Sequence, residues 1–146
     1  MKIKVSTIKD LDKLFAELQK RINIAQTTDV AAAVREEMKD QIEQEVYSVY
    51  DPKVYERKKD NGGLTDDENI DSYLTDATTL VVESNRFDGD KNVGETIVTG
   101  DGYDYSFPYS GRPRDYIEAT RDSLEVTGAH VDALKHGLKR QKLDVK

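Results

Sequence analysis

Apolar side chains recur every three or four positions through the first third of the chain, which is the spacing of one helical face. In the first such stretch these positions are Leu11, Leu14, Phe15, Leu18 and Ile22. Thr7 and Asp10 are the two candidates for the N-cap of this helix. Because the apolar face is narrow, the pattern predicts a helix that lies on another element without being enclosed by it.

A longer apolar stripe follows and predicts the central helix of the fold. Its members are Val30, Val34, Met38, Ile42, Val46 and Val49. Thr27 or Thr28 is expected to cap this helix at its start. Pro52 ends it near Tyr50, because proline lacks a backbone donor and disfavours helical geometry at the preceding residue. The sequence therefore predicts two separate helices before the first proline.

The middle of the chain changes to a strand-like pattern. Ile70–Leu74 and Tyr103–Tyr109 alternate, and Thr78–Phe87 is rich in β-branched residues, so each is predicted as a strand. Asp88–Gly94 has the composition of a loop. Glu95–Val98 fits either a short helix or a strand.

Two further helices are predicted near the C-terminus. The first starts at Pro113, which is tolerated in a first turn, and runs to about Glu125. Gly128 is expected to follow it in a left-handed conformation. The second covers about His130–Arg140 and contains Gly137, which costs about 1 kcal/mol relative to alanine.

These elements, with a short edge strand at Met1–Val5, predict an α+β fold. The pattern is two helices, an interrupted sheet region and then two further helices. A chain of 146 residues is expected to form a single domain over residues 1–146. Charged residues and Gly62-Gly63 predict a mobile arm at about residues 51–70, and residues 141–146 are expected to form a flexible tail.

Composition excludes several classes of function. The formal net charge is −7, with 29 acidic and 22 basic residues, so general or sequence-specific binding to nucleic acid is not expected. The chain has no cysteine, which excludes disulfides and thiolate chemistry. No stretch approaches the roughly 20 apolar residues of a membrane span. We therefore expect no membrane partner and synthesis in the cytoplasm.

Candidate catalytic or metal-binding sets are missing from the sequence. His130 and His136 fall on different faces of their helix. The segment from Asp88 to Asn92 begins like a calcium loop, but Val93 replaces the expected glycine and Thr99 the expected glutamate. The sequence predicts no metal, no cofactor and no enzymatic activity.

Two stretches instead carry tyrosine and arginine, the residue types enriched at protein interfaces. The predicted interface residues are Tyr47, Tyr50, Tyr55, Arg57, Leu64, Arg112, Arg114 and Tyr116. A second interpretation stays open for each stretch. The arm can be a surface loop fixed to its own domain, and the two arginines after Gly111 can bond nearby carbonyls or acids of their own chain.

The same stretches resemble the small tail-completion, or head–tail joining, proteins of long-tailed bacteriophages. The similar motifs, in chain order, are Val49–Arg57, Gly62-Gly63-Leu64, Arg112–Thr120 and Ala133–Leu138. The resemblance covers nearly the whole chain, and the order of the motifs is more specific than any one of them. The family usually has phenylalanine directly after the proline, whereas this chain has Arg114-Asp115 before Tyr116.

The resemblance implies an α+β virion protein without enzymatic activity. It implies an antiparallel sheet packed on the long amphipathic helix, with further helices at the N- and C-termini. It implies a ring, generally a hexamer, at the junction of tail and capsid, with the tail-tube and head-completion or connector proteins as partners. Two other functions remain open at this point. One is a cytosolic adaptor or regulator that binds through the arm, and the other is an enzyme whose site assembles between subunits.

Overall fold

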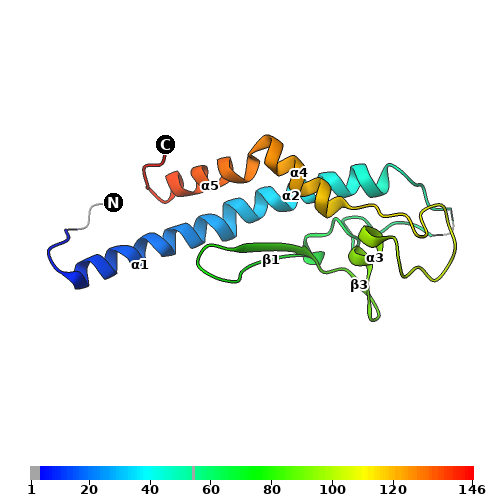
Figure 1. The fold of residues 1–146 in the computed structure, drawn as a ribbon, viewed down its shortest axis with the longest axis horizontal. Coiled ribbons are helices and arrows are strands. Elements are labelled where there is room, and N and C mark those ends of the chain that lie inside the picture. The colour runs from blue at the N-terminus through cyan, green and yellow to red at the C-terminus, as the bar shows by residue number, and fades with distance from the viewer. Residues whose placement is uncertain (1–3, 54) are drawn as a thin grey trace. The chain divides into compact units, whose positions relative to one another are not determined.

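The computed structural model describes residues 4–53 and 55–146 (Figure 1). Its contacts divide the chain into two compact units. Unit 1 combines the segment up to Ala33 with Ser72–Val81 and Gly128–Lys146, and unit 2 combines Val34–Asp71 with Val82–Thr127. Each unit therefore depends on segments that are far apart in the sequence. The expectation of a single domain over residues 1–146 stays a prediction.

Helix α1 spans Ile8–Ala25 and begins with a capping box. The Thr7 hydroxyl accepts from the Asp10 backbone N–H at 3.2 Å, and the Asp10 carboxylate accepts from the Thr7 N–H at 3.1 Å. The two candidate caps therefore act together. Lys4 and Val5 do not form the predicted edge strand, and Met1–Ile3 lie outside the described residues.

The predicted break after α1 is absent. A π-helical segment, η1 (Gln26–Val30), leads directly into α2 (Ala31–Ile42), and a second one, η2 (Glu43–Tyr47), ends the helical run. Thr27 donates its hydroxyl hydrogen bond back to the Asn23 carbonyl at 2.9 Å. A threonine bonded to the preceding turn cannot cap a new helix, so the prediction of two helices was wrong.

Unit 1 is held by the approach of α5 (Ala129–Arg140) to α1 and η1 (Figure 1). Gly137 is buried at this contact. A Cβ atom there would lie 2.9 Å from the Ala25 Cβ and 2.5 Å from the Asp29 carboxylate. The glycine that looks costly in sequence is therefore needed for close helix packing. Arg140 also pairs with Asp29 at 2.6 Å.

Unit 2 contains the main hydrophobic core. Apolar residues of α2 and η2 pack there against β1 (Ile70–Leu74), α3 (Val93–Thr99) and α4 (Tyr116–Thr127). The buried members are Met38, Ile42, Val46, Tyr47, Leu64, Ile70, Ile97 and Tyr116. The second half of the predicted stripe is therefore buried, as its spacing predicts, and it forms one side of the core of this unit.

The strands form two small antiparallel sheets, so the α+β fold class is confirmed. β1 (Ile70–Leu74) has the predicted bounds and pairs with β2 (Leu80–Ser84). β3 (Phe87–Asp88) pairs with β4 (Lys91–Asn92) in a hairpin, with Phe87 opposite Asn92. The predicted loop at residues 88–94 is thus part of a hairpin that leads into α3, and the ambiguous segment at residues 95–98 is helical.

Tyr103–Tyr109 is not a strand, although its alternation predicted one. A turn closes the segment, because the Ser110 N–H donates to the Phe107 carbonyl and the Phe107 N–H donates to the Ser110 hydroxyl, both at 3.0 Å. The rings pack against each other instead of on the two faces of a sheet. The helix after it starts at Tyr116, and Gly128 has the predicted left-handed φ of 67°.

Candidate functional site

The end of the long helix in unit 2 is capped by the arm. Arg57 donates from Nη1 to the Tyr47 carbonyl at 2.8 Å and from Nη2 to the Val46 carbonyl at 3.4 Å, and it also bonds the Tyr50 carbonyl. Its guanidinium lies 4.9 Å from the centre of the Tyr47 ring. A cation at a helix C-terminus is favourable because the last carbonyls carry partial negative charge. This part of the arm is therefore fixed to its own unit.

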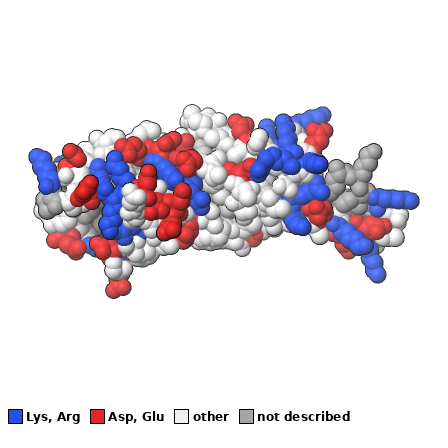
Figure 2. Space-filling model, turned by 180° about the vertical axis from the view of Figure 1, so that it is seen from behind, with Lys and Arg blue, Asp and Glu red and all other residues white. Residues whose placement is uncertain are grey.

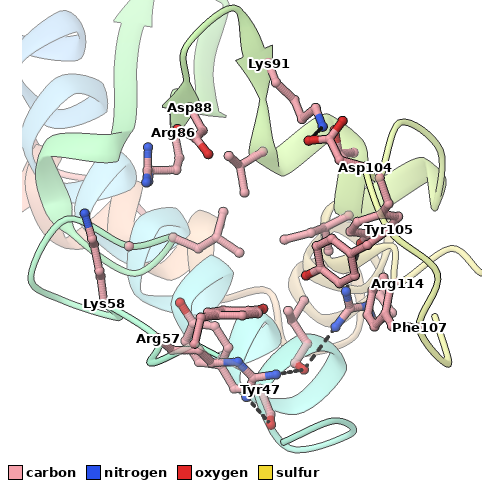
Figure 3. Close-up of a pocket in the computed structure, with 18 of the residues that line it drawn as sticks. Tyr47, Arg57, Lys58, Arg86, Asp88, Lys91, Asp104, Tyr105, Phe107 and Arg114 are labelled. Atoms are coloured by element: carbon pink, nitrogen blue, oxygen red, sulfur yellow. Dashed lines mark hydrogen bonds and ion pairs between the residues drawn. The ribbon is translucent and has the colours of Figure 1, made fainter. Parts of the chain in front are cut away.

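Arg114 reaches the same helix end from the segment before α4 (Figure 3). It donates to the Val46 carbonyl at 3.5 Å and to the Tyr103 hydroxyl at 2.9 Å. Its guanidinium lies 4.8 Å from the centre of the Tyr109 ring, and only 7% of the residue is exposed. The buried charge is stabilised by the carbonyl, the hydroxyl and the aromatic face together.

An aromatic cluster surrounds this arginine. Its members are Tyr50, Tyr103, Tyr105, Phe107 and Tyr109. The closest pair is Tyr103 and Phe107, whose centroids are 4.6 Å apart in an edge-to-face arrangement. The Tyr109 hydroxyl donates to the Val49 carbonyl at 3.1 Å, which joins the cluster to the residues after η2. The cluster thus fixes the segment after α3 against the helix end.

A pocket of about 350 Å³ opens between these parts of unit 2 (Figure 3). Its floor is apolar and includes Val46, Leu64 and Ile97. Basic side chains outnumber acidic ones in its wall, namely Arg57, Lys58, Arg86, Lys91 and Arg114 against Glu56, Asp88 and Asp104. Lys91 pairs with Asp104 at 2.8 Å. The lining therefore combines an apolar floor with an excess of basic side chains.

Two core tyrosines stay neutral near the pocket. Burial raises the pKa of Tyr116 to about 12, and burial also raises the pKa of Tyr47. The Tyr116 hydroxyl lies beside Ser84, and a Cβ atom at Gly94 would be 2.6 Å from it. Among the described residues the Tyr116 hydroxyl has no well-formed hydrogen-bond partner, whereas the Tyr47 hydroxyl interacts with Thr65 and with the Leu64 backbone. A raised pKa makes these groups poor nucleophiles or bases at neutral pH.

The structure separates the predicted interface residues into two groups. Tyr47, Leu64, Arg114 and Tyr116 are buried in unit 2, where they form its core and cap its helix. Core packing and helix capping account for these four residues in this conformation, and their role in an interface is likewise a prediction. Tyr50 and Arg57 are half-buried, whereas Tyr55, at 53% exposed, and Arg112 are on the surface. For these last residues the interface role stays a prediction.

Several residues of the pocket were missed by the sequence reasoning. Residues 103–109 of the aromatic cluster were assigned to a strand. Of the basic lining residues, Lys58 was placed in the mobile arm, Arg86 in a predicted strand and Lys91 in a predicted loop. One signal was available: Pro108 lies within the aromatic run, and glycines bracket it, which argues against a strand in a sheet. The meeting of the β3–β4 hairpin with the arm had no such signal.

The described residues contain no group of three or more His, Cys, Asp or Glu placed to hold a metal ion. Within the same part of the chain, no helix has the length and apolar character needed to cross a membrane. Acidic and basic side chains lie next to each other on the face shown in Figure 2. The pocket is therefore the feature of unit 2 that combines a concave apolar surface with charge.

Comparison with known proteins identifies the family. The family model described as YomN matches residues 10–140. The chain belongs to the YomN family. "SPbeta prophage-derived uncharacterized protein YomN" of Bacillus subtilis (strain 168) is 29% identical over 136 residues, which cover 91% of this chain and 93% of that protein. No solved structure matches the chain. The YomN match includes every residue that lines the pocket.

Proposed function

We propose that this YomN-family chain is a structural protein of a phage particle that completes the tail or joins it to the head. The observation that carries the proposal is the similarity to a prophage-derived protein over nearly the full length of both chains. The resemblance of the motif order to tail-completion proteins supports the finer role. In this role the protein acts by self-association into a ring, which contacts the tail tube and the head connector.

The distribution of exposed residues supports a role in assembly. Tyr55, Tyr105 and Phe87 are about half exposed around the pocket of unit 2. Exposed aromatic side chains beside basic ones are typical of protein interfaces, because they bury a wide apolar area at a small loss of conformational entropy. The protein acts without catalysis, and its two core tyrosines serve the fold.

Deletion of the gene from an inducible phage tests the proposal. After induction, electron microscopy is expected to show filled heads and free tails that do not join. Expression of the intact protein in trans should restore complete particles. Complete infectious particles without this protein would contradict the proposal, and a defect confined to DNA packaging or lysis would assign the protein to another step.

Labelling separates the proposal from a cytosolic adaptor. A gold-labelled antibody against the protein should mark purified particles at a single place, the junction of head and tail. An adaptor that binds its partner only in the cell would leave purified particles unlabelled. Particles that lack the gene product serve as the control for antibody specificity.

A further inference from the structure

Two arginines in the wall of the unit 2 pocket carry positive charge that no carboxylate neutralises. Arg57 and Arg114 both donate to the Val46 carbonyl, at 3.4 and 3.5 Å (Figure 3). Neither forms an ion pair among the described residues, and the Nε–H of the buried Arg114 has no hydrogen-bond partner there. Two guanidinium groups at one carbonyl repel each other, and a buried cation without a carboxylate is costly. An anion in the pocket relieves both effects.

The accessible part of the wall adds two further cations. Lys58 is exposed on the arm, and Arg86 is half-buried just before β3. Figure 3 shows both side chains on the same side of the pocket. In the part of the chain that the structure describes, neither of them belongs to an ion pair. A negatively charged group in the pocket can therefore contact these two side chains while it lies in the field of the two arginines.

Another basic residue of the wall is already paired with a carboxylate of the chain. Lys91 forms an ion pair with Asp104 at 2.8 Å, and the Asp104 side chain is 88% exposed. An exposed ion pair is weak and exchanges easily with another partner. Asp104 therefore competes with an acidic ligand for Lys91.

The floor of the pocket requires that the ligand also has an apolar part. Val46, Leu64 and Ile97 line the pocket, and its volume of about 350 Å³ lies near the lower end of the range of about 300–1,000 Å³ for ligand pockets. Tyr55 and Tyr105 line it as well, and each is about half exposed. Exposed tyrosines beside arginines are typical of surfaces that bind proteins. The pocket therefore suits an apolar side chain whose neighbours carry carboxylates.

Nucleic acid is a poorer match, although phosphate also pairs with arginine. The whole chain has a net charge of −7, so it repels a polyanion at long range. A peptide with two carboxylates is repelled much less, and it gains apolar contact with the floor. Charge and shape together thus favour a peptide.

We propose that the pocket of unit 2 binds an acidic segment of a partner protein. An apolar side chain of the segment fills the pocket, and the flanking carboxylates lie against Lys58 and Arg86. The inference goes beyond the proposed function, because it names the chemistry of a binding partner and holds wherever that partner is located.

Short synthetic peptides and the full-length chain test the proposal. The probe peptide has a phenylalanine between two glutamates in a glycine-serine frame, and the control peptide has glutamines in place of the glutamates. The backbone amide NMR signals of the isotope-labelled chain report both the affinity and the place of binding. The probe should bind about five- to tenfold more tightly than the control and shift signals of the pocket lining. Equal affinity of the two peptides, or shifts confined to unit 1, would overturn the proposal.

Matched variants separate the pocket from the net charge of the chain. Lys58→Glu should weaken binding of the probe about three- to tenfold, whereas Lys135→Glu, at an exposed lysine of unit 1 that does not line the pocket, should change it little. Asp104→Asn should tighten binding about two- to threefold, because it removes a competing carboxylate and frees Lys91. Asp144→Asn makes the same change in net charge in unit 1. Equal effects within each pair of variants would mean that the pocket does not bind the probe.

Other occupants of the pocket give different results. A thymidine oligonucleotide that shifts the same signals at lower concentration than the probe would assign the pocket to phosphate and overturn the proposal. Dilution of the chain alone that shifts these signals would show that a second copy occupies the pocket, with the same consequence. The labelling of particles tests the proposed function separately, so either inference can fail while the other stands.

Discussion

The two units bury very different side chains. Unit 2 encloses large apolar residues such as Ile42, Ile70 and Tyr116, each at most 1% exposed. The tightest contact of unit 1 is made by small residues, Ala25 and Gly137, which let α5 approach α1 and η1. Unit 2 is therefore stabilised mainly by the apolar area that it buries. Unit 1 depends on close helix packing and leaves apolar surface exposed.

The largest effect on the free energy of unfolding is expected in the core of unit 2. Ile42→Ala should lower the free energy of unfolding by about 2–5 kcal/mol, because it leaves a cavity at a fully buried site. Ile8→Ala, the same change at an 80% exposed site, should alter it by less than about 0.5 kcal/mol. Urea titration followed by circular dichroism measures both. Equal losses of unfolding free energy in Ile42→Ala and Ile8→Ala would contradict the difference in burial between the two sites.

High pH should also lower the stability of unit 2. The pKa of Tyr116 is about 12 in the folded chain against an ordinary value of 10.0, because burial disfavours the anion. The unfolded chain then loses this proton first, so stability is complete below pH 10 and falls as the pH rises toward 12. The loss from this residue is about 2–3 kcal/mol. Stability measured against pH should fall less steeply in Tyr116→Phe, and an unchanged slope would contradict the assignment.

A smaller effect is expected at the helix contact of unit 1. Gly137→Ala places a Cβ atom 2.9 Å from the Ala25 Cβ, and this overpacking should outweigh the helix-propensity gain of about 1 kcal/mol. A net loss of about 1 kcal/mol is expected. Combining it with Ala25→Gly removes the close contact with Ala25 and leaves the one with the Asp29 carboxylate, so the double variant should lose less than the sum of the single ones. Additive losses would show that the two atoms do not compete for space.

The smallest effect on stability is expected at the uncovered end of α1. Phe15→Ala should change the free energy of unfolding by less than about 0.5 kcal/mol, because the side chain is 58% exposed. Thermal unfolding of the purified chain measures this change. A loss of the size expected for Ile42→Ala would mean that Phe15 packs within its own chain, contrary to its exposure.

Local features of the fold were readable from the sequence. The α1 face, the Thr7 and Asp10 cap, the bounds of β1 and the left-handed Gly128 were all predicted, and each is confirmed. These features depend on a few neighbouring residues, through helical periodicity, capping hydrogen bonds and the freedom of glycine at positive φ. The order of helices and strands also indicated the α+β class.

The candidate site was harder to predict from the sequence, because its contacts join residues that lie far apart in the chain. Arg114 bonds a carbonyl that lies 68 residues earlier in the chain, and nothing in its local sequence identifies that partner. The aromatic run at residues 103–109 alternates as a strand would, yet its rings pack around this arginine. Sequence reasoning therefore found residue types that meet in this site, but not which of them lie in the core and which lie on the surface.

The sequence by itself determined the periodic faces, the caps, the turns and the absence of thiol chemistry. Only the tertiary structure decided that one helical run continues through Thr27 and Thr28, and that Tyr116 belongs to the core. The reason is that a threonine can cap a helix or bond its preceding turn at similar cost. A tyrosine can likewise line a surface or fill a core, and in both cases the packing of distant segments decides between the alternatives.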